Sequence, residues 1–270
     1  MGNTFKNRLY STRSPLLVLM LLGAAQASRG DTGENRLLTT GCDELLRPHI
    51  ANYDVYRRGK LLGTSTSELS LDTNGHWLYQ VSTRATRGVG GLLGGQIHES
   101  ARFRVVAGTL QPKHYDLSQK VAFSKVKRNT EFDWKENRAR GKNKRKHWQL
   151  ALQGNESDRL SANIRLRMQL ASGKSQLSFK TVEKGEFKVR DFEAREAETV
   201  VTVIGEMLAI PVHRKHSNSK RTTVTWHAPQ LGYLPVRIVH AKKGKERGTM
   251  ILKEFQQQEC STAATRLVTD

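Results

Sequence analysis

The clearest pattern along this chain is an alternation of apolar and polar residues with a period of two. Trp77, Tyr79 and Val81 would share one face of a strand, with polar Gln80 and Ser82 between or after them. The alternation recurs in the pairs Phe103/Val105, Phe132/Trp134, Phe187/Val189, Val224/Trp226 and Val236/Ile238. Successive side chains of a strand point to opposite faces, so this pattern predicts a sheet with one buried face and one wet face.

Turn signals separate the strand-like segments at short, regular intervals. Thr73-Asn74-Gly75, just before Trp77, is a strong hairpin signal. Similar breaks occur at Arg58-Gly59-Lys60, Ala107-Gly108, Lys184-Gly185 and Lys243-Gly244-Lys245. Short strands joined by tight turns are typical of antiparallel architectures. The fold class predicted is therefore mainly all-β, a large curved antiparallel sheet or an incomplete β-barrel.

One segment departs from this period and predicts a short helix around residues 158–170. Ser157 is a candidate N-cap, Asp158 is an acid in the first turn and Gly173 is a natural stop. Apolar residues recur there in steps of four, at Leu160, Ile164 and Met168. We expect this helix to pack on the sheet or to plug its open end, with Arg159, Arg165 and Arg167 coating its other side. An irregular strand is the alternative.

The first 27 residues predict a cleaved export signal. A basic lead of Lys6, Arg8 and Arg13 precedes an uncharged apolar run, Pro15–Ala25, and the small-x-small pattern Ala25-Gln26-Ala27. An apolar run of about 11 residues is too short for a membrane span, which needs roughly 20. The predicted organisation is a signal (1–27), a polar N-terminal arm (28–41), a single β-rich domain (42–260) and a C-terminal tail (261–270). No transmembrane segment is expected after cleavage.

The two cysteines, Cys42 and Cys260, lie near the ends of the predicted domain. In an exported chain an even count favours a disulfide. A bridge closing so long a loop would contribute at most roughly 5 kcal/mol in the chain-entropy model. Two free thiols are the alternative. Lipidation at Cys42 is disfavoured, because Thr39 stands where a lipid-attachment box has Leu.

The chain carries 45 Lys and Arg against 25 Asp and Glu, a formal charge of +20. This excess predicts attraction to lipid head groups, acidic polymers or nucleic acid, although it also serves solubility alone. Six cations gather within one short run: Arg138, Arg140, Lys142, Lys144, Arg145 and Lys146. The run is either an anion-binding loop or a solvated hairpin tip between strands at 132–134 and 148–152. It lacks the interleaved aromatics that stack on bases, so no specific nucleic-acid binding is expected.

A glycine-rich segment, Gly88–Gly95, lacks the Gly-Lys-Ser/Thr ending of a phosphate-binding loop and the spacing of a dinucleotide loop. It is either a flexible connection or a mobile flap at a pocket mouth. The flap residues would be Gly90, Gly91, Leu92, Leu93 and Gly94.

The residues give little support for an enzymatic reaction. His213 and His216 supply only two ligands, where zinc sites need three or four, so no metal is predicted. The nucleophile elbow Gly-x-Ser-x-Gly is absent from the sequence. No catalytic residue and no cofactor are proposed, although a hydrolase whose site is assembled from distant residues stays open.

Several motifs follow one another in a recognisable order: Tyr53-Asp54-Val55-Tyr56, Leu110–Tyr115, Phe132–Lys135, Asp158–Ser161, Val224–Pro229 and Tyr233–Ile238. Together they resemble the family of exported bacterial proteins catalogued as domain of unknown function 3108. The resemblance covers about Tyr53 to Phe255, and Trp-x-Ala-Pro with Tyr-Leu-Pro-Val is its most specific part. It implies a periplasmic or envelope β protein of a Gram-negative bacterium and supplies no activity.

The leading functional hypothesis is non-enzymatic binding of a lipid or other amphipathic ligand. The pocket would be a concave sheet lined by Trp77, Tyr79, Phe103, Phe132, Trp134 and Trp226. The alternative is an interaction module that docks on an anionic envelope polymer or a partner protein through the basic run at 138–146.

Overall fold

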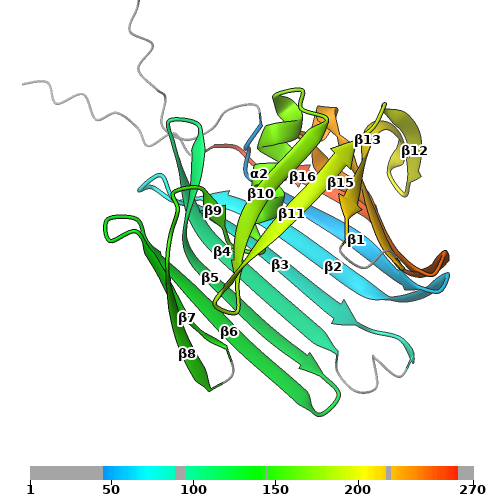
Figure 1. The fold of residues 1–270 in the computed structure, drawn as a ribbon. Helices are drawn as coiled ribbons and strands as arrows, with labels where there is room; N and C mark the ends of the chain where they lie inside the picture. The colour runs from blue at the N-terminus through cyan, green and yellow to red at the C-terminus, as the bar shows by residue number, and fades with distance from the viewer. Residues whose placement is uncertain (1–44, 89–94, 144, 217–219, 261–270) are drawn as a thin grey trace, which may run out of the picture. The chain divides into compact units, whose positions relative to one another are not determined.

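The computed structural model describes residues 45–88, 95–143, 145–216 and 220–260, all within one compact unit, Thr39–Asp270. Nearly every element is a strand (Figure 1). The strands are β1 (His49–Arg57), β2 (Lys60–Leu71), β3 (Trp77–Ala85), β4 (Gln96–Val106), β5 (Thr109–Val121), β6 (Ser124–Asp133), β7 (Arg138–Asn143), β8 (Lys146–Ala151), β9 (Glu156–Ser157), β10 (Gln176–Glu183), β11 (Glu186–Ala194), β12 (Glu198–Thr202), β13 (Gly205–Lys215), β14 (Arg221–Ala228), β15 (Leu234–Lys242) and β16 (Lys245–Gln257). Helix α2 (Ser161–Ala171) and a 3-10 turn, η1 (Pro229–Leu231), complete them.

All these strands form one curved sheet, in the order β8-β7-β6-β5-β4-β3-β2-β1-β16-β15-β14-β13-β11-β10-β9, with β12 on β13. Every pair is antiparallel except β9 with β10. The first and last long strands are neighbours, since β1 pairs with β16 along its length. Among the described strands the path ends at β8 and β9, so hydrogen bonds do not close the sheet. The predicted fold class, a curved antiparallel sheet with one short helix, is confirmed.

The predicted turns lie where the glycine signals placed them. Four hairpins turn on a residue followed by glycine, both with positive φ: Arg58-Gly59, Ala107-Gly108, Lys184-Gly185 and Lys243-Gly244. Two positive φ values in succession match the right-handed twist of the flanking strands. At the β2–β3 turn the Asp72 carboxylate accepts hydrogen bonds from the backbone N–H groups of Asn74 and His76.

Helix α2 starts at Ser161, three residues later than predicted, and the Asp158 carboxylate binds the backbone N–H groups at its start. Asp158 Oδ1 accepts from the backbone N–H of Leu160 at 2.7 Å and of Ser161 at 2.8 Å. Ser157 is fully buried, and its hydroxyl has no hydrogen-bond partner in the described structure, so it is not the cap. Gly173, at φ 75°, follows the helix end as expected.

The two arginines of α2 lie where the sequence did not predict them. Arg165 and Arg167 were expected on a solvated side, yet both are buried. Arg165 donates to the carbonyl oxygens of Asn155 and Leu110, and Arg167 donates to those of Gly232 and Leu45. A buried guanidinium needs such partners, since burying an unpaired charge is costly. The helix is therefore enclosed on more than one side.

Helix α2 joins strands from distant parts of the chain. Leu160 and Ile164, just before and within it, pack with β2–β5, whereas Ala162, Leu166 and Leu170 pack with β10 and β13. A further cluster brings Phe132 and Ala139 of β6 and β7 against Val182 of β10. Side chains thus hold the two margins of the sheet together where hydrogen bonds do not.

Several predictions lie outside the described residues. They concern the export signal, the arm at 28–41, Cys42, the flap residues Gly90, Gly91, Leu92, Leu93 and Gly94, and the tail at 261–270. The domain boundaries accordingly stay predictions. In the segments that the structure covers, no helix is long and apolar enough to cross a membrane.

Candidate ligand-binding face

The face of the sheet that contacts helix α2 is called here the inner face. Tyr79 of β3 and Val212 of β13 belong to it, because both lie in core clusters with residues of the helix segment. Cross-strand partners share a face, so the pairing register extends it to neighbouring strands. Val212 faces Thr225, Thr225 faces Ile238, and Ile238 faces Met250.

One row further along these strands, polar residues take over the inner face. Arg214 of β13, Thr223 of β14 and His240 of β15 are consecutive cross-strand partners. We call these three residues the polar row. On β11 the partner of Arg214 is Phe192, an apolar neighbour for its side chain.

Arg214 is the unusual member of the polar row. It is half-buried, and no ion pair to an acid is found for it among the described residues. Burial and then the positive charge of Arg159 lower the pKa of its guanidinium. An arginine held near another cation, with no acid opposite, attracts an anion.

Thr223 connects two histidines at this position. Its hydroxyl lies 3.0 Å from His216 Nε2 and 3.0 Å from His240 Nδ1. Burial, followed by the charge of Arg214, lowers the pKa of both imidazoles. The histidines are therefore biased toward their neutral forms, which leaves Arg214 as the permanent cation of the row.

The facing wall, on β4 and β5, carries a compact hydrogen-bonded group. Tyr115 donates its hydroxyl to Glu99 Oε2 at 3.1 Å, and Arg159 lies 3.3 Å from Glu99 Oε1. Burial, together with the charge of Glu99, raises the pKa of the Tyr115 phenol. Glu99 is therefore occupied by Arg159 and Tyr115.

Apolar side chains line the inner face beside these groups. Val81, two residues beyond Tyr79, and Ile97, two residues before Glu99, are half-buried and pack on the first core cluster. Val55 and Ile238 are half-buried on neighbouring strands and share the face through Met250. The inner face therefore combines a partly exposed apolar wall with a cation that lacks an acid.

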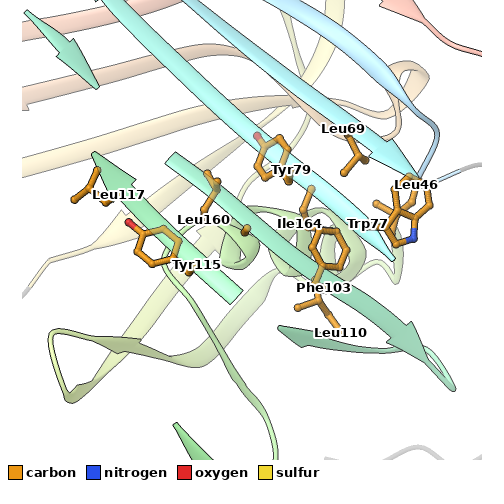
Figure 2. Close-up of a cluster of buried hydrophobic side chains, with 11 residues drawn as sticks. Leu46, Leu69, Trp77, Tyr79, Phe103, Leu110, Tyr115, Leu117, Leu160 and Ile164 are labelled. Carbon is orange, nitrogen blue, oxygen red and sulfur yellow. The ribbon is translucent and has the colours of Figure 1, made fainter. Parts of the chain in front are cut away.

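Three of the six aromatics predicted to line a pocket lie instead inside packed protein. Trp77, Tyr79 and Phe103 are at most 5 % exposed and contact Leu160 and Ile164 of the helix segment (Figure 2). The Trp77 and Phe103 rings stack with centroids 6.5 Å apart. Helix α2 occupies the space that the sequence analysis assigned to a ligand.

The other three aromatics lie in two further places. Phe132 and Trp134 stack at 6.1 Å, and Trp134 Nε1 donates to the Pro112 carbonyl at 2.6 Å. Trp226 faces the opposite side of the sheet from Thr225, where it contacts the Arg237 guanidinium and donates to Glu198. The six residues do not share one surface, and their role in ligand binding stays a prediction.

The basic run forms strand β7, the β7–β8 turn and the first residue of β8, so it is not a free loop. Arg138 and Arg140 lie 3.6 Å and 2.8 Å from carboxylates of Asp133 and Glu131 on β6. Lys142, Arg145 and Lys146 are exposed, and Lys144 lies outside the described residues. Two of the six cations are thus already neutralised by the neighbouring strand.

A cavity of about 480 Å³ lies beside helix α2 and is lined by Arg47, His49, Arg167, Tyr233 and Phe255 among others. His49 Nδ1 donates to the Arg47 carbonyl at 2.7 Å, and burial lowers the pKa of His49 to about 4. Across the described ranges, no group of three or more His, Cys, Asp and Glu is arranged to hold a metal ion.

Comparison with known families identifies the chain. The model of a family described as protein of unknown function, DUF3108, matches residues 52–250. The chain belongs to the DUF3108 family. The match includes the Trp-x-Ala-Pro and Tyr-Leu-Pro-Val motifs. His227, within the first motif, is buried and stabilises the β14–β15 turn by donating Nδ1–H to the Tyr233 carbonyl at 2.8 Å. No curated protein matches this DUF3108 member.

Solved structures extend the likeness to fold. A β-barrel-like protein of domain of unknown function DUF1849 from Brucella abortus has a TM-score of 0.52 at 12 % identity, covering 80 % of this chain and 99 % of that one. A protein from Bacteroides fragilis described as exported, with a YmcC-like fold, reaches 0.33 at 13 % identity over 78 % and 97 %. A protein from Parabacteroides distasonis described as a lipoprotein reaches 0.33 at 9 % identity over 78 % and 96 %. Only the DUF1849 protein has a TM-score high enough to support an argument, and at 12 % identity it indicates a shared fold alone.

From the sequence, Asp158 was expected only as an acid in the first turn and Arg165 only on the other side of the helix, and Arg214 was not singled out. Asp158 had a signal, since an acid two or three residues before an apolar run is a good cap. The local sequence around Arg214 carries no such signal, because its neighbours Arg159 and His240 come from distant parts of the chain.

Proposed function

We propose that this protein is a non-enzymatic exported protein that holds an anionic amphiphile against its inner face. The observation that carries the proposal is that half-buried Arg214, which has no ion pair among the described residues, lies on the same face of the sheet as the half-buried apolar residues Ile238 and Ile97. An acyl chain would cover the apolar wall, and its carboxylate or phosphate would accept hydrogen bonds from Arg214.

Both the apolar wall and Arg214 would gain favourable interactions from a bound amphiphile. Burying apolar surface contributes about 25 cal/mol per Å², so half-exposed valine and isoleucine side chains stabilise a bound chain. A guanidinium presents a planar fork of donors that fits a carboxylate or phosphate. Thr223, held between two histidines, supplies a further hydroxyl within the polar row.

Export and the disulfide belong to the same proposal. The predicted signal and the positive charge support a location in the bacterial envelope, the periplasm in the first instance. His49 pairs with Gln257, and Gln258 N–H donates to the Pro48 carbonyl at 2.8 Å, so the two ends of the domain lie together. No cysteine among the described residues is a free thiol, which supports a Cys42–Cys260 bridge.

The first test is native mass spectrometry of protein purified from a bacterial periplasm without detergent. The expected result is a co-purifying amphiphile, identified by solvent extraction and carrying a carboxylate or phosphate. A protein of bare mass that also fails to bind a fluorescent long-chain fatty acid and a fluorescent lysophospholipid would contradict the proposal.

A pair of variants locates the site. Ile97→Trp adds bulk to the inner face and is expected to lower binding of the fluorescent fatty acid about 10-fold. Ser118→Trp places the same ring at an exposed position on the neighbouring strand and should leave binding unchanged. Equal effects of the two substitutions would place the ligand elsewhere.

Docking through the basic run at 138–146 is the less supported alternative. Glu131 and Asp133 already neutralise two of its cations, so fewer charges are available to a polymer.

A further inference from the structure

The hairpin topology gathers alternate turns at one end of the sheet. Neighbouring strands run antiparallel, so the β1–β2, β5–β6 and β15–β16 turns lie at the same end. The β2–β3 and β4–β5 turns lie at the other end (Figure 1). Near these turns, Trp77, Phe103 and Leu110 pack with residues of the helix segment. We call these the distal end and the helix end.

The distal turns carry a concentration of cations. Each of the three hairpins contributes at least two exposed basic side chains, and we call six of them the basic rim: Arg58, Lys60, Lys120, Lys125, Lys243 and Lys245. Although these residues are far apart in the sequence, the fold places them along one edge of the molecule.

The basic rim is not neutralised by nearby acids. No ion pair of a rim residue is found in the described part of the chain. Two acids of the β10–β11 hairpin, Glu183 and Glu186, pair with Arg190 and Lys188 on β11. Glu246 is the exposed acid beside the β15–β16 turn. The distal end therefore presents a net positive surface.

An exposed aromatic stands within this surface. Phe123, at the tip of the β5–β6 hairpin, is 98 % exposed, and nearby Val121 is 45 % exposed. Lys120 and Lys125 flank this apolar tip on both sides. An apolar ring surrounded by lysines suits a membrane interface, where the ring enters the headgroup region and the cations meet lipid phosphates.

We propose that the basic rim and Phe123 dock the distal end on an anionic phospholipid bilayer. A bilayer is favoured over a soluble polyanion because only the bilayer offers an apolar region in which the exposed Phe123 ring can be buried. In this orientation the polar row, which lies on the distal side of the helix-packed core, faces the lipid from which an amphiphile would come. The docking does not require that the inner face binds a ligand.

The test is co-sedimentation with vesicles of phosphatidylcholine alone or mixed with phosphatidylglycerol. The protein is expected to bind the mixed vesicles, to bind neutral vesicles poorly and to dissociate at high salt. The double variant Lys120→Glu/Lys125→Glu should lower partitioning on the order of 30-fold.

A matched control separates the basic rim from net charge. Lys135 and Lys174 are exposed at the helix end, so Lys135→Glu/Lys174→Glu makes the same charge change away from the rim. We expect this pair to change partitioning less than about 3-fold. An equal loss in both double variants, or equal binding of the two vesicle types, would overturn the proposal.

Phe123→Ser distinguishes a bilayer from a soluble polyanion. It should weaken binding to anionic vesicles several-fold and leave binding to soluble polyphosphate unchanged. If Phe123→Ser has no effect on vesicles, or if polyphosphate binds as tightly as vesicles do, the surface is a general polyanion site and the bilayer proposal fails. Retention of the fluorescent fatty acid, measured without vesicles, reports separately on the inner-face proposal.

Discussion

The helix end and the distal end of this sheet use the same basic residues in opposite ways. At the helix end, Arg165 and Arg167 are buried, and carbonyl oxygens of other segments accept their hydrogen bonds. At the distal end, cations such as Lys120 and Lys243 are exposed and lack acidic partners among the described residues. Net charge alone describes neither end.

The difference shows how position determines what a charge contributes. A buried guanidinium with satisfied donors fixes one arrangement of the segments it joins, because any other arrangement leaves the charge unpaired. An exposed lysine contributes little to folding and acts instead through its field on a partner. Stability is therefore concentrated at the helix end and surface attraction at the distal end.

Substitution of two phenylalanines should give the largest difference in the free energy of unfolding between the two ends. Phe103 is 0 % exposed in the helix-packed cluster, and Phe123 is 98 % exposed at the distal tip. Phe103→Ala is expected to lower the free energy of unfolding by about 3–5 kcal/mol, because it removes buried contacts and leaves a cavity. Phe123→Ala should change it by less than about 0.5 kcal/mol. Urea unfolding of both variants tests this, and comparable losses would refute the contrast.

Histidines offer a second comparison, through pH. Burial lowers the pKa of His227 from 6.5 to about 4. Between these values the unfolded chain binds more protons at this site than the folded one, so stability rises with pH. The contribution of His227 is complete above 6.5 and is lost as pH falls toward 4, by on the order of 2–3 kcal/mol.

The measurement is urea unfolding at about pH 7.5 and about pH 4.5. His227→Gln should shrink the acid-induced loss, and His240→Gln should change it less, because the His240 side chain is less buried than that of His227. Asp158 acts in the other direction: burial raises its pKa from 3.8 to about 6, so acid adds stability there. Comparing variants removes this opposing contribution, and parallel pH curves for His227→Gln and the parent would contradict the assignment.

Arg214 provides a functional comparison with a buried arginine. Arg214→Gln should lower the affinity for the fluorescent fatty acid about 10-fold, since a charge-assisted hydrogen bond contributes about 1.5–3 kcal/mol before desolvation. Stability should hardly change, because no acid depends on Arg214 for charge balance. Arg165→Gln, in contrast, should destabilise the fold. Fluorescence titration and thermal unfolding of the two variants decide between these roles.

The smallest expected effect concerns an exposed ion pair at the helix end. Arg102 lies 3.6 Å from Asp72, and about half of the Arg102 side chain is exposed. Arg102→Ala is expected to cost less than about 1 kcal/mol, because solvent screens such pairs. A larger loss in urea unfolding would mean that exposed pairs also hold the helix end together.

The sequence predicted the elements well where local chemistry decides them. Alternation identified the strands around Trp77 and Phe103, and residue-glycine pairs such as Lys243-Gly244 located the hairpins. The fold class and the family followed from these local signals. For the basic run at 138–146 the sequence left an anion-binding loop and a hairpin tip open, and its ion pairs with Glu131 and Asp133 are revealed only by strand register.

The candidate site was less accessible to sequence reasoning. The aromatic residues marked the buried face correctly at Trp77, Tyr79 and Phe103, but nothing in their pattern shows that α2 fills the space beside them. Likewise, the four-residue steps of α2 predict one apolar side, although the helix is enclosed by strands from both halves of the sheet.

The sequence by itself determined the strand alternation, the hairpin turns, the helix stop at Gly173 and the excess of positive charge. Each of these depends on neighbours in the chain or on composition. Only the tertiary structure decided that Arg165 is buried, that the charge of Arg159 acts on an Arg214 with no ion pair among the described residues, and that three distant hairpins form one basic rim. These features arise from register and curvature, which bring together residues that are tens to more than a hundred positions apart.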